Sequence, residues 1–364
     1  MTTPIPDKMR AWLYTSVPDG LEKAIFLSEN VPTPARTPQT LAKNDILVRV
    51  EAASLNPVDH KLPEITNALT PRFLTSAATA LPKPTDPVPK GAKTPAHDFA
   101  GTVVATGSAV DTVRIGERVF GLTPGTLAEY VVTNYNRLAT LPSNASFEEG
   151  AAAVTTALTT YQSIAPFVKA GSNGAEKVFI NGGSGGTGTM AVQIAKALGC
   201  HVTATCSTRN IELVKSLGAD EVIDYTSQDV VAELTSKGKV FKLVVDNVGN
   251  SPANLYKAAD NFLVEQGAQF VQVGGGASAA DIKILASRSL VPSFLGGGRH
   301  KYMFILPKLT HDNIVDVANL IRDDKLKPVI DEVFEWSDAP AAYTKLKTGR
   351  ARGNIVVRGP PAKA

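Results

Sequence analysis

"KVFINGGSGGTGTMAVQIAK", residues 177–196, is the stretch that decides the fold of this chain. A short apolar run leads into a segment with five glycines among the seven residues 182–188, and a segment with helical spacing of Ala and Ile follows. This order of residues predicts a β-strand, a glycine-rich turn and the start of an α-helix. Glycine concentrated between two regular elements indicates a turn whose backbone must bend sharply or approach something closely.

Strand and helix patterns alternate on both sides of this turn. Strands at such spacing, joined by helical crossovers, predict a parallel, doubly wound sheet. The expected elements are a helix at 147–164, strands at 178–181, 201–206, 222–225, 243–247 and 270–273, and helices at 189–198, 209–217, 227–234 and 252–262.

The flanking parts of the chain are different, because strand patterns dominate before residue 147. Strand-like runs occur at 11–14, at 46–52 and between 99 and 133, and the tail adds helices at 313–323 and 339–347 with strands at 328–334 and 353–358. We therefore predict an α/β protein of two domains. A β-rich domain of residues 1–146 is completed by 311–364, and the doubly wound domain of residues 147–310 is inserted between them.

Residues 62–96 are rich in Pro, Ala and Thr. Proline cannot donate to a sheet, so this segment is predicted to be a long loop. Both a lid over a site and a mobile surface insertion fit the composition.

Composition excludes several classes of protein. The 364 residues are too many for one typical core. A net charge of +3 without a block of like charges argues against a nucleic-acid or anionic-membrane surface. Cys200 and Cys206 cannot build a disulfide framework or a four-cysteine zinc site, and no run reaches the length of a membrane span. Because the N-terminal stretch has neither a signal-peptide nor a transit-peptide pattern, we expect a cytoplasmic protein.

The glycine turn contains the spacing G-x-G-x-x-G at Gly183, Gly185 and Gly188. In a dinucleotide-binding turn the first glycine permits the tight bend, the second lets the backbone approach the pyrophosphate, and the third lets helix and strand pack closely. The helix N-terminus adds free N–H groups and a partial positive charge. The residues expected to bind a dinucleotide here are Gly183, Ser184, Gly185, Gly186, Thr187 and Gly188.

The end of the second predicted strand indicates which dinucleotide binds. Enzymes that use NAD usually place Asp or Glu there to bond the ribose 2′-hydroxyl. This chain reads "TCSTRN" at 205–210, with no acidic residue. Ser207 can donate to a phosphate and Arg209 can pair with one, which favours NADPH, although Arg209 could also be a solvated charge at a helix start.

Together these motifs resemble the quinone oxidoreductase branch of the medium-chain dehydrogenase/reductase superfamily, and the resemblance covers nearly the whole chain. Segments 62–96 and 294–302 are similar to those of fungal members, which include enoyl reductases that partner polyketide synthases. The resemblance implies a GroES-like catalytic domain beside a Rossmann domain, with the active site in the cleft between them. The motifs that carry it are "LNPVDHK" (55–61), "HDFAGTVVATG" (97–107), "GERVFG" (116–121), "LTTYQS" (158–163), "NGGSGGTGTMAVQIAKALG" (181–199), "LGADEVIDY" (217–225), "VVDNVG" (244–249) and "GRARGNIVV" (349–357).

The resemblance also implies further cofactor-binding residues. Tyr225 is expected by the adenosine 2′-phosphate, and Gly274 and Gly275 by the nicotinamide ribose. Asn354 is expected to approach the cofactor from the last strand. The others are Asn56, Pro57 and Asp59 of the N-P-x-D turn, Thr159 near the carboxamide, and Asn247.

No metal is expected in this chain. Zinc alcohol dehydrogenases need a Cys in the early turn and a Gly-His-Glu motif, whereas this chain has Asn56 and Ala96-His97-Asp98. Catalytic zinc needs three protein ligands and an open position, and no cysteine lies near these residues. His97 is interpreted instead as a hydrogen-bonded turn residue.

Without zinc, the expected chemistry is direct hydride transfer from the nicotinamide to a quinone or to an alkene conjugated to a carbonyl. The enolate that forms needs hydrogen-bond donors and a proton. Lys61 and Asn56 are the candidate catalytic residues, and Tyr302 is a weaker one. A solvated surface position for Lys61 and water as the proton source both stay open.

Three functions are therefore compatible with the sequence. The first is an NADPH-dependent reductase of free quinones or enones. The second is a trans-acting enoyl reductase whose substrate is bound to a carrier protein. The third is a nucleotide-binding scaffold or sensor with weak or no turnover. A monomer or homodimer is expected in each case.

Overall fold

The computed structural model describes residues 5–34, 37, 39–69, 81–275, 284, 287–288 and 298–361. The chain forms two compact units. The first comprises Met1–Thr155, Leu309–Asp323 and Ile330–Ala364, and the second comprises Thr156–Lys308 and Asp324–Val329. The division falls inside helix α3 (Phe147–Ile164). The predicted ranges of the catalytic and cofactor-binding domains stay a prediction.

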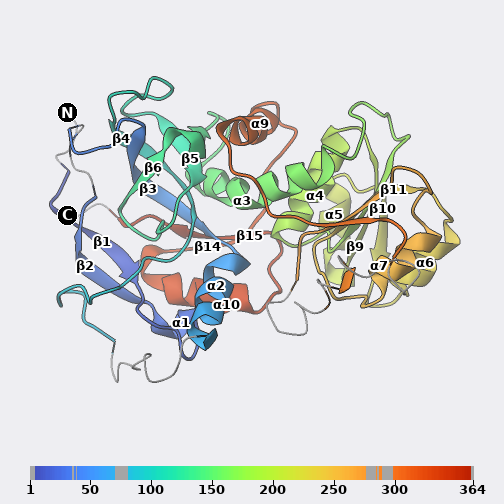
Figure 1. The fold of residues 1–364 in the computed structure, drawn as a ribbon, viewed down its shortest axis with the longest axis horizontal. Coiled ribbons are helices and arrows are strands. Elements are labelled where there is room, and N and C mark those ends of the chain that lie inside the picture. The colour runs from blue at the N-terminus through green and yellow to red at the C-terminus, as the bar shows by residue number, and fades with distance from the viewer. Residues whose placement is uncertain are drawn as a thin grey trace. The chain divides into compact units, whose positions relative to one another are not determined.

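A seven-stranded sheet organises the first unit, with the path β14-β15-β3-β4-β5-β7 and with β6 paired to β3. Strand β3 is central because it pairs antiparallel with β4, β6 and β15. The C-terminal strand therefore completes a sheet begun near the N-terminus (Figure 1). The strands are β3 (Asp45–Leu55), β4 (Asp98–Thr106), β5 (Arg118–Leu122), β6 (Tyr130–Asn134), β7 (Leu138–Thr140), β14 (Ile330–Phe334) and β15 (Asn354–Arg358).

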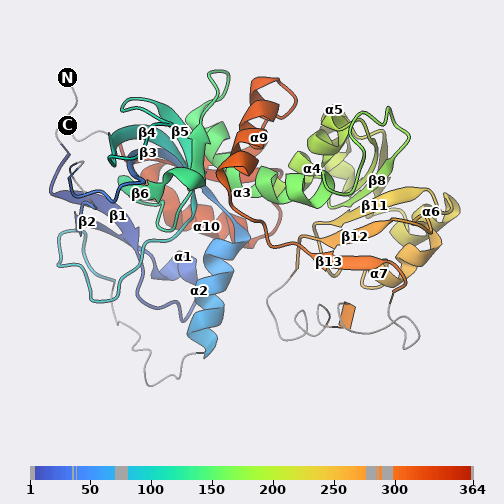
Figure 2. The ribbon, with the colours of Figure 1, turned by 45° about the horizontal axis from the view of Figure 1, so that its top comes forward.

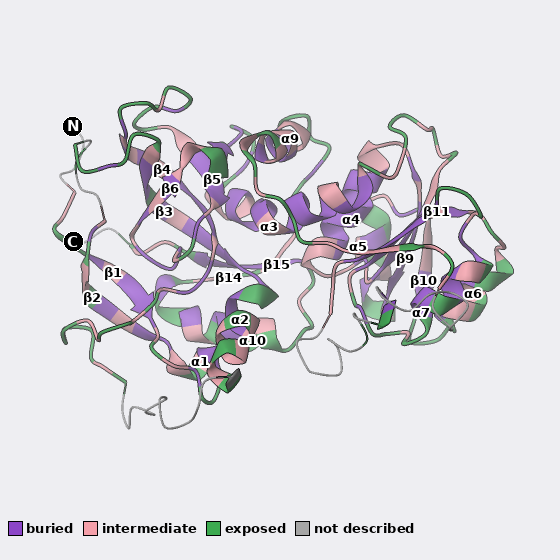
Figure 3. Ribbon diagram, viewed as in Figure 1, coloured by how far each residue is buried: buried purple, intermediate pink, exposed green. Residues whose placement is uncertain are grey.

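Apolar side chains on both faces of this sheet form the cores of the first unit. One cluster includes Ile46, Val48 and Phe99, and another joins Trp12, Trp336 and Tyr343. The smaller elements around the sheet are the hairpin β1 (Lys8–Leu13) and β2 (Phe26–Pro32), with α1 (Leu21–Ala24), α9 (His311–Arg322) and α10 (Ala339–Lys347). Buried residues run along β3, β15 and α3 (Figure 3).

Helix α2 (Pro57–Leu69) occupies the first part of the segment predicted to be a loop. That prediction is wrong for residues 62–69. Pro57 takes the first helical position, where a missing N–H costs nothing. Pro63 lies inside the helix, where proline normally breaks it. Tertiary packing of α2 against α1 and α10 offsets this cost.

The rest of that segment has no regular structure where it is described. Residues 81–96 form turns and a single β-bridge between Lys93 and Tyr14. Residues 70–80 lie outside the described residues.

The second unit is built on a six-stranded parallel sheet in the order β10-β9-β8-β11-β12-β13. Counted from β8, this is the strand order 3-2-1-4-5-6 of dinucleotide-binding folds, with the reversal between β8 and β11. Strands β11, β12 and β13 lie side by side in Figure 2. The strands are β8 (Lys177–Asn181), β9 (His201–Cys206), β10 (Glu221–Asp224), β11 (Phe241–Asp246), β12 (Gln269–Gln272) and β13 (Lys301–Phe304).

Short helices connect these strands. They are α4 (Gly186–Ala197), α5 (Ile211–Ser216), α6 (Val230–Ser236) and α7 (Leu255–Ala258), with a 3₁₀ turn at Thr208–Asn210 before α5 and another at Ala259–Asn261 after α7. The predicted fold class, a β-rich domain with a doubly wound parallel sheet, is confirmed. Strand β13 was not predicted, because four residues at a sheet edge are too short to show a clear period.

Candidate functional site

The glycine turn lies between β8 and α4, at the carboxyl end of the sheet. Gly182 has φ +79°, a left-handed conformation that side chains rarely adopt, so Gly182 makes the tight bend expected of Gly183. A Cβ atom on Gly188 would lie 2.0 Å from the carbonyl oxygen of Gly182. A Cβ atom on Gly185 would meet nothing within 4 Å in the part of the chain that the structure describes. The turn therefore needs glycine at 188 for helix–strand packing and leaves the space above 185 open.

The neighbouring loop after β11 supplies an unsatisfied amide. Both polar side-chain atoms of Asn247 are buried and have no hydrogen-bond partner among the described residues. A Cβ atom on Gly274 would lie 1.8 Å from the carbonyl oxygen of Asn247. The backbone at Gly274 therefore packs directly against the backbone of the loop after β11, which leaves no room for a side chain at 274. Buried amides are normally paired. A buried amide without a partner among the described residues, beside a turn that lacks side chains, is suited to hydrogen-bond the polar groups of a dinucleotide. This arrangement supports the predicted cofactor site.

The end of β9 carries the residues predicted to select NADPH. Arg209 is exposed and makes no ion pair with the described residues, and Tyr225 is 56 % exposed. Ser207 Oγ accepts a hydrogen bond from Asn210 Nδ2 at 3.3 Å, and the same amide donates to Ser184 Oγ at 3.0 Å. Asn210 thus ties this corner to the glycine turn, a role that its sequence position did not indicate.

Asp224 adds a negative charge to this corner. Hydrogen bonds from the hydroxyls of Thr208 (2.5 Å) and Thr226 (2.6 Å) hold the pKa of its carboxyl down at about 2. The carboxylate is therefore ionised at neutral pH and already engaged by these hydroxyls. The sequence did not reveal it, because Asp224 ends the third strand of the fold rather than the second.

The other predicted cofactor residues lie as follows. Thr159 is buried on α3, Gly275 follows Gly274, and Asn354 is buried at the start of β15. Gly183 packs close to β9, because a Cβ atom there would lie 3.0 Å from Ala204 Cβ. Gly186 and Thr187 form the first residues of α4, which has no side-chain cap. The backbone N–H groups of that first turn remain available to an anion.

The first unit contains a buried polar cluster around the N-P-x-D turn. Asp59 Oδ1 accepts a hydrogen bond from His97 Nδ1 at 2.5 Å, and Asp59 Oδ2 accepts one from the backbone N–H of Asn56 at 2.7 Å. The side chain of Asp59 is fully buried, whereas that of His97 is 31 % exposed. The hydrogen bond that His97 donates to Asp59 raises the pKa of His97 above its usual value. The sequence interpretation of His97 as a hydrogen-bonded turn residue did not identify this partner.

Asp98 is the second carboxyl of this cluster and is completely buried. It accepts hydrogen bonds from Asn56 Nδ2 (2.8 Å), Thr155 N (3.0 Å) and Thr155 Oγ1 (2.6 Å). Burial nevertheless raises the pKa of Asp98 to about 7. Asn56 is one of the predicted catalytic and cofactor-binding residues. One hydrogen of its side-chain amide is already donated to Asp98.

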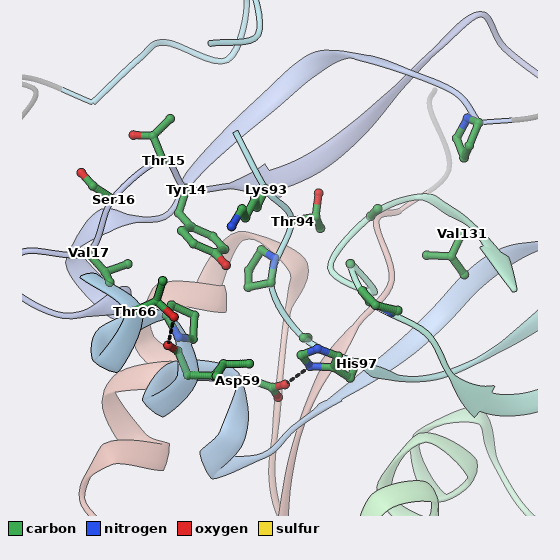
Figure 4. A pocket seen from close by; sticks show the side chains of 18 of the residues that line it. Tyr14, Thr15, Ser16, Val17, Asp59, Thr66, Lys93, Thr94, His97 and Val131 are labelled. Carbon is green, nitrogen blue, oxygen red and sulfur yellow. Dashed lines mark hydrogen bonds and ion pairs between the residues drawn. The ribbon is translucent and has the colours of Figure 1, made fainter. Parts of the chain in front are cut away.

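A cavity of about 880 Å³ opens in front of the His97–Asp59 pair, within the first unit (Figure 4). Tyr14, Lys93 and Thr94 contribute polar groups to its wall, and Leu62 and Pro95 contribute apolar surface. The volume is in the range of small-molecule sites. The cavity combines apolar walls with a few convergent polar groups, as binding sites for small organic molecules do.

Lys61 does not line this cavity. The residues of α2 that do are Asp59, Leu62, Pro63, Thr66 and Asn67. Their spacing marks one face of the helix, and Lys61 lies roughly 160° from Asp59 around the axis. Lys61 therefore lies on a different face of α2 from the residues that line the cavity.

Tyr302, the weaker candidate donor, is also engaged elsewhere. Its hydroxyl donates to Gln272 Oε1 at 2.6 Å, and burial raises its pKa to about 12. Arg288 Nη1 donates to the same oxygen at 2.6 Å. Tyr302 belongs to a polar network of the second unit.

The described residues contain no group of three His, Cys, Asp or Glu side chains placed to hold a metal ion. Cys200 and Cys206 are buried thiols whose pKa values burial raises to about 11, and neither belongs to such a group. The donor set of the described chain does not fit catalytic zinc. None of the described helices is long and apolar enough to cross a membrane.

Comparison with known proteins defines the class of the chain. The alcohol dehydrogenase GroES-like domain family matches residues 42–143, and the zinc-binding dehydrogenase family matches residues 217–357. The chain belongs to the medium-chain dehydrogenase/reductase superfamily, in its quinone oxidoreductase and enoyl reductase branch, which is a branch of NAD(P)-binding oxidoreductases.

Particular relatives cover almost the whole chain. The trans-enoyl reductase pgmF of Aspergillus terreus is 40 % identical over 372 residues, with 98 % of each chain covered. The mitochondrial NAD(P)H oxidoreductase RTN4IP1 of Homo sapiens is 30 % identical, over 98 % of this chain and 90 % of the relative. Among solved structures, the quinone oxidoreductase of Coxiella burnetii is 27 % identical with a TM-score of 0.74, over 96 % of this chain and 99 % of that chain.

Proposed function

We propose that this protein is an NADPH-dependent reductase of α,β-unsaturated carbonyl compounds or quinones that works by direct hydride transfer without zinc. One observation supports it most: the bare glycine turn at the strand reversal lies beside the orphaned amide of Asn247. The proposed cofactor residues are those predicted from the sequence, with Gly182 and Asn210 as supports of the turn.

The bound nicotinamide would supply the hydride, and the chain must supply binding, orientation and a proton. Reduction of an enone leaves an enolate whose oxygen requires hydrogen-bond donors. Donors and a cavity of suitable size lie together in the first unit, around His97, Tyr14 and Lys93. These groups support reduction of a carbonyl-conjugated alkene.

The direct test follows the absorbance of reduced nicotinamide with a panel of enones and quinones, alongside elemental analysis of the purified protein. We expect turnover with at least one class and no stoichiometric zinc. Nucleotide binding without oxidation across the whole panel would favour the scaffold or sensor function instead.

A carrier-bound substrate is the second candidate, and it is favoured by the name of the 40 % identical relative, a trans-enoyl reductase. The 880 Å³ cavity has room for a substantial acyl group. Reduction of an enoyl group on a carrier protein, without reduction of the same group as a free thioester, would select this function.

Replacement of Arg209 by Ala is expected to weaken the preference for NADPH over NADH. A hydrogen bond to a charged group contributes about 1.5–3 kcal/mol, so the loss should reach about tenfold in the ratio of the two dissociation constants. Calorimetric titration with both nucleotides measures it. Lys215→Ala, which removes an exposed cation from the following helix α5, is the matched control and should leave the ratio unchanged. Equal affinity of the wild type for both nucleotides would refute this assignment.

Replacement of Lys61 by Ala tests the catalytic residue proposed from the sequence. If Lys61 delivers the proton, Lys61→Ala should lower kcat for an enone by about tenfold or more, the low end for losing a proton-transfer group, with unchanged NADPH affinity. Steady-state kinetics and nucleotide titration separate the two effects. Unaltered turnover would remove Lys61 from the mechanism, in keeping with its position off the cavity face of α2.

A cytoplasmic location and a monomeric or homodimeric state stay part of the proposal. Fractionation and light scattering would test them.

A further inference from the structure

We propose that His97 is a catalytic residue of the first unit: held by Asp59, it presents Nε2 to a substrate in the adjoining cavity and delivers to the α-carbon the proton that completes reduction. This inference rests on the proposed reductase function and assigns a proton donor to it.

The position of His97 is rigidly determined. The carbonyl oxygens of Pro95, Ala96 and His97 accept backbone hydrogen bonds from Leu127, Gly125 and Thr123, at 3.2, 2.8 and 2.9 Å. Ala96 is buried and has φ +68°, an uncommon conformation for a residue with a side chain. Such conformations are retained where the surroundings enforce them, frequently at functional sites. This bend directs His97 to the cavity wall.

The contacts of Asp59 also determine which nitrogen of the His97 imidazole donates to it. Asp59 is buried and its Oδ2 is bonded to the backbone of Asn56, so its Oδ1 accepts from His97 and Nδ1 must carry a hydrogen. The titrating nitrogen is then Nε2, which makes no hydrogen bond with the described residues. Figure 4 shows the imidazole among the side chains that line the cavity, joined to Asp59 by a dashed line. A carboxylate that orients an imidazole and stabilises its charged form is a recurring arrangement of acid–base catalysis.

The proposed step balances as follows. The β-carbon of the enone gains a C–H bond with hydride from the reduced nicotinamide, and the π electrons of the alkene move into an enolate. The imidazolium gives the Nε2 proton to the α-carbon of this enolate, which forms the second C–H bond and restores the carbonyl, and the neutral imidazole is reprotonated from solvent. The net change is uptake of one hydride and one proton, with the nicotinamide oxidised and the alkene reduced.

Quinones provide an internal comparison. Their reduction yields a hydroquinone anion whose charge is delocalised in an aromatic ring, so no proton has to be delivered to carbon. Loss of His97 should therefore slow enone reduction far more than quinone reduction. A merely structural role would impair both substrates alike.

The pH dependence follows from the charge on the imidazole. Asp59, the partner of His97, raises its pKa, and Asp98 acts in the same direction. The other titratable groups of the cavity wall are Tyr14, Lys93 and Tyr130. Because the acid must be protonated, kcat for an enone should fall as pH rises through the pKa of His97.

The test compares His97→Asn with His60→Asn. His60 is a matched control, since it also faces a carboxylate (Glu64, 3.3 Å) and lies next to Asp59 without lining the cavity. We expect His97→Asn to lower kcat for an enone at least tenfold, to change quinone reduction less than about threefold, and to abolish the alkaline fall of kcat. His60→Asn should keep the wild-type profile. His97→Gln, which retains an amide donor near Nε2, serves if the Asn variant does not fold.

A second readout needs no nucleotide. Nuclear magnetic resonance of the labelled imidazole should give His97 a pKa above that of an ordinary histidine, and Asp59→Asn should lower it. Wild-type turnover with an unchanged profile in His97→Asn, or an ordinary pKa for His97, would overturn this inference and leave the proposed function standing. A wild type inactive on every enone and quinone would overturn both.

Discussion

Substitution of Gly188 by Ala is expected to destabilise the second unit by about 1–3 kcal/mol or more, because overpacking costs that much in a well-packed core. The added methyl would lie 2.0 Å from the carbonyl oxygen of Gly182, which is backbone and cannot rotate aside. Strand β8 and helix α4 would have to separate, and the turn between them would lose its geometry. Chemical denaturation without nucleotide measures the loss, and NADPH titration should show at least a hundredfold weaker binding.

Gly185→Ala is the matched control for this prediction. A methyl group at 185 meets nothing within 4 Å among the described residues, so stability should stay near that of the wild type. The same methyl would occupy the space proposed for the pyrophosphate, and affinity for NADPH should fall about tenfold, or about 1.4 kcal/mol. If Gly185→Ala bound NADPH as tightly as the wild type, the proposed position of the cofactor would be wrong.

The second large effect is expected for Asp98→Ala. This change leaves Asn56 Nδ2, Thr155 N and Thr155 Oγ1 without their acceptor inside the first unit. An unsatisfied buried donor costs about 1–3 kcal/mol, so a total loss of about 3 kcal/mol or more in the free energy of unfolding is expected. Denaturant titration measures it. A loss below about 1 kcal/mol would show that water or a rearrangement satisfies these donors.

Asp98→Asn separates shape from charge in the same position. Its side chain keeps an oxygen for Asn56 and Thr155, so it should be much more stable than the Ala variant. The pKa of Asp98 is about 7 in the folded protein, against about 3.9 in an unfolded chain. Between these values the folded state holds the extra proton, so the Asp98 contribution makes stability fall as pH rises from about 4 to about 7. This part of the pH dependence should vanish in Asp98→Asn, and an unchanged slope would contradict the raised pKa.

Local sequence patterns predicted the elements of the second unit better than they predicted segment 62–96 of the first unit. In the second unit, buried strands separated by glycine and short helices carry a local signal, so β9 and α3 have the predicted bounds. The prediction for 62–96 was less successful. Proline content is a local property, whereas helix α2 is stabilised by packing against α1 and α10, which are distant in sequence.

The candidate site shows the same division. The glycine turn could be recognised because the positions that must lack a side chain are close together in the sequence and are occupied by glycine. The His97–Asp59 pair could not, since its members are 38 positions apart and each looks ordinary in its own segment.

By itself the sequence determined the class of fold and the place of the dinucleotide turn, since both depend on short-range periodicity and on glycine. Only the tertiary structure decided which carboxyl holds which donor, and which face of α2 borders the cavity. Asp98 lies on β4, which pairs with β3, and it bonds Thr155 of α3, so elements distant in sequence bury it, and this burial raises its pKa.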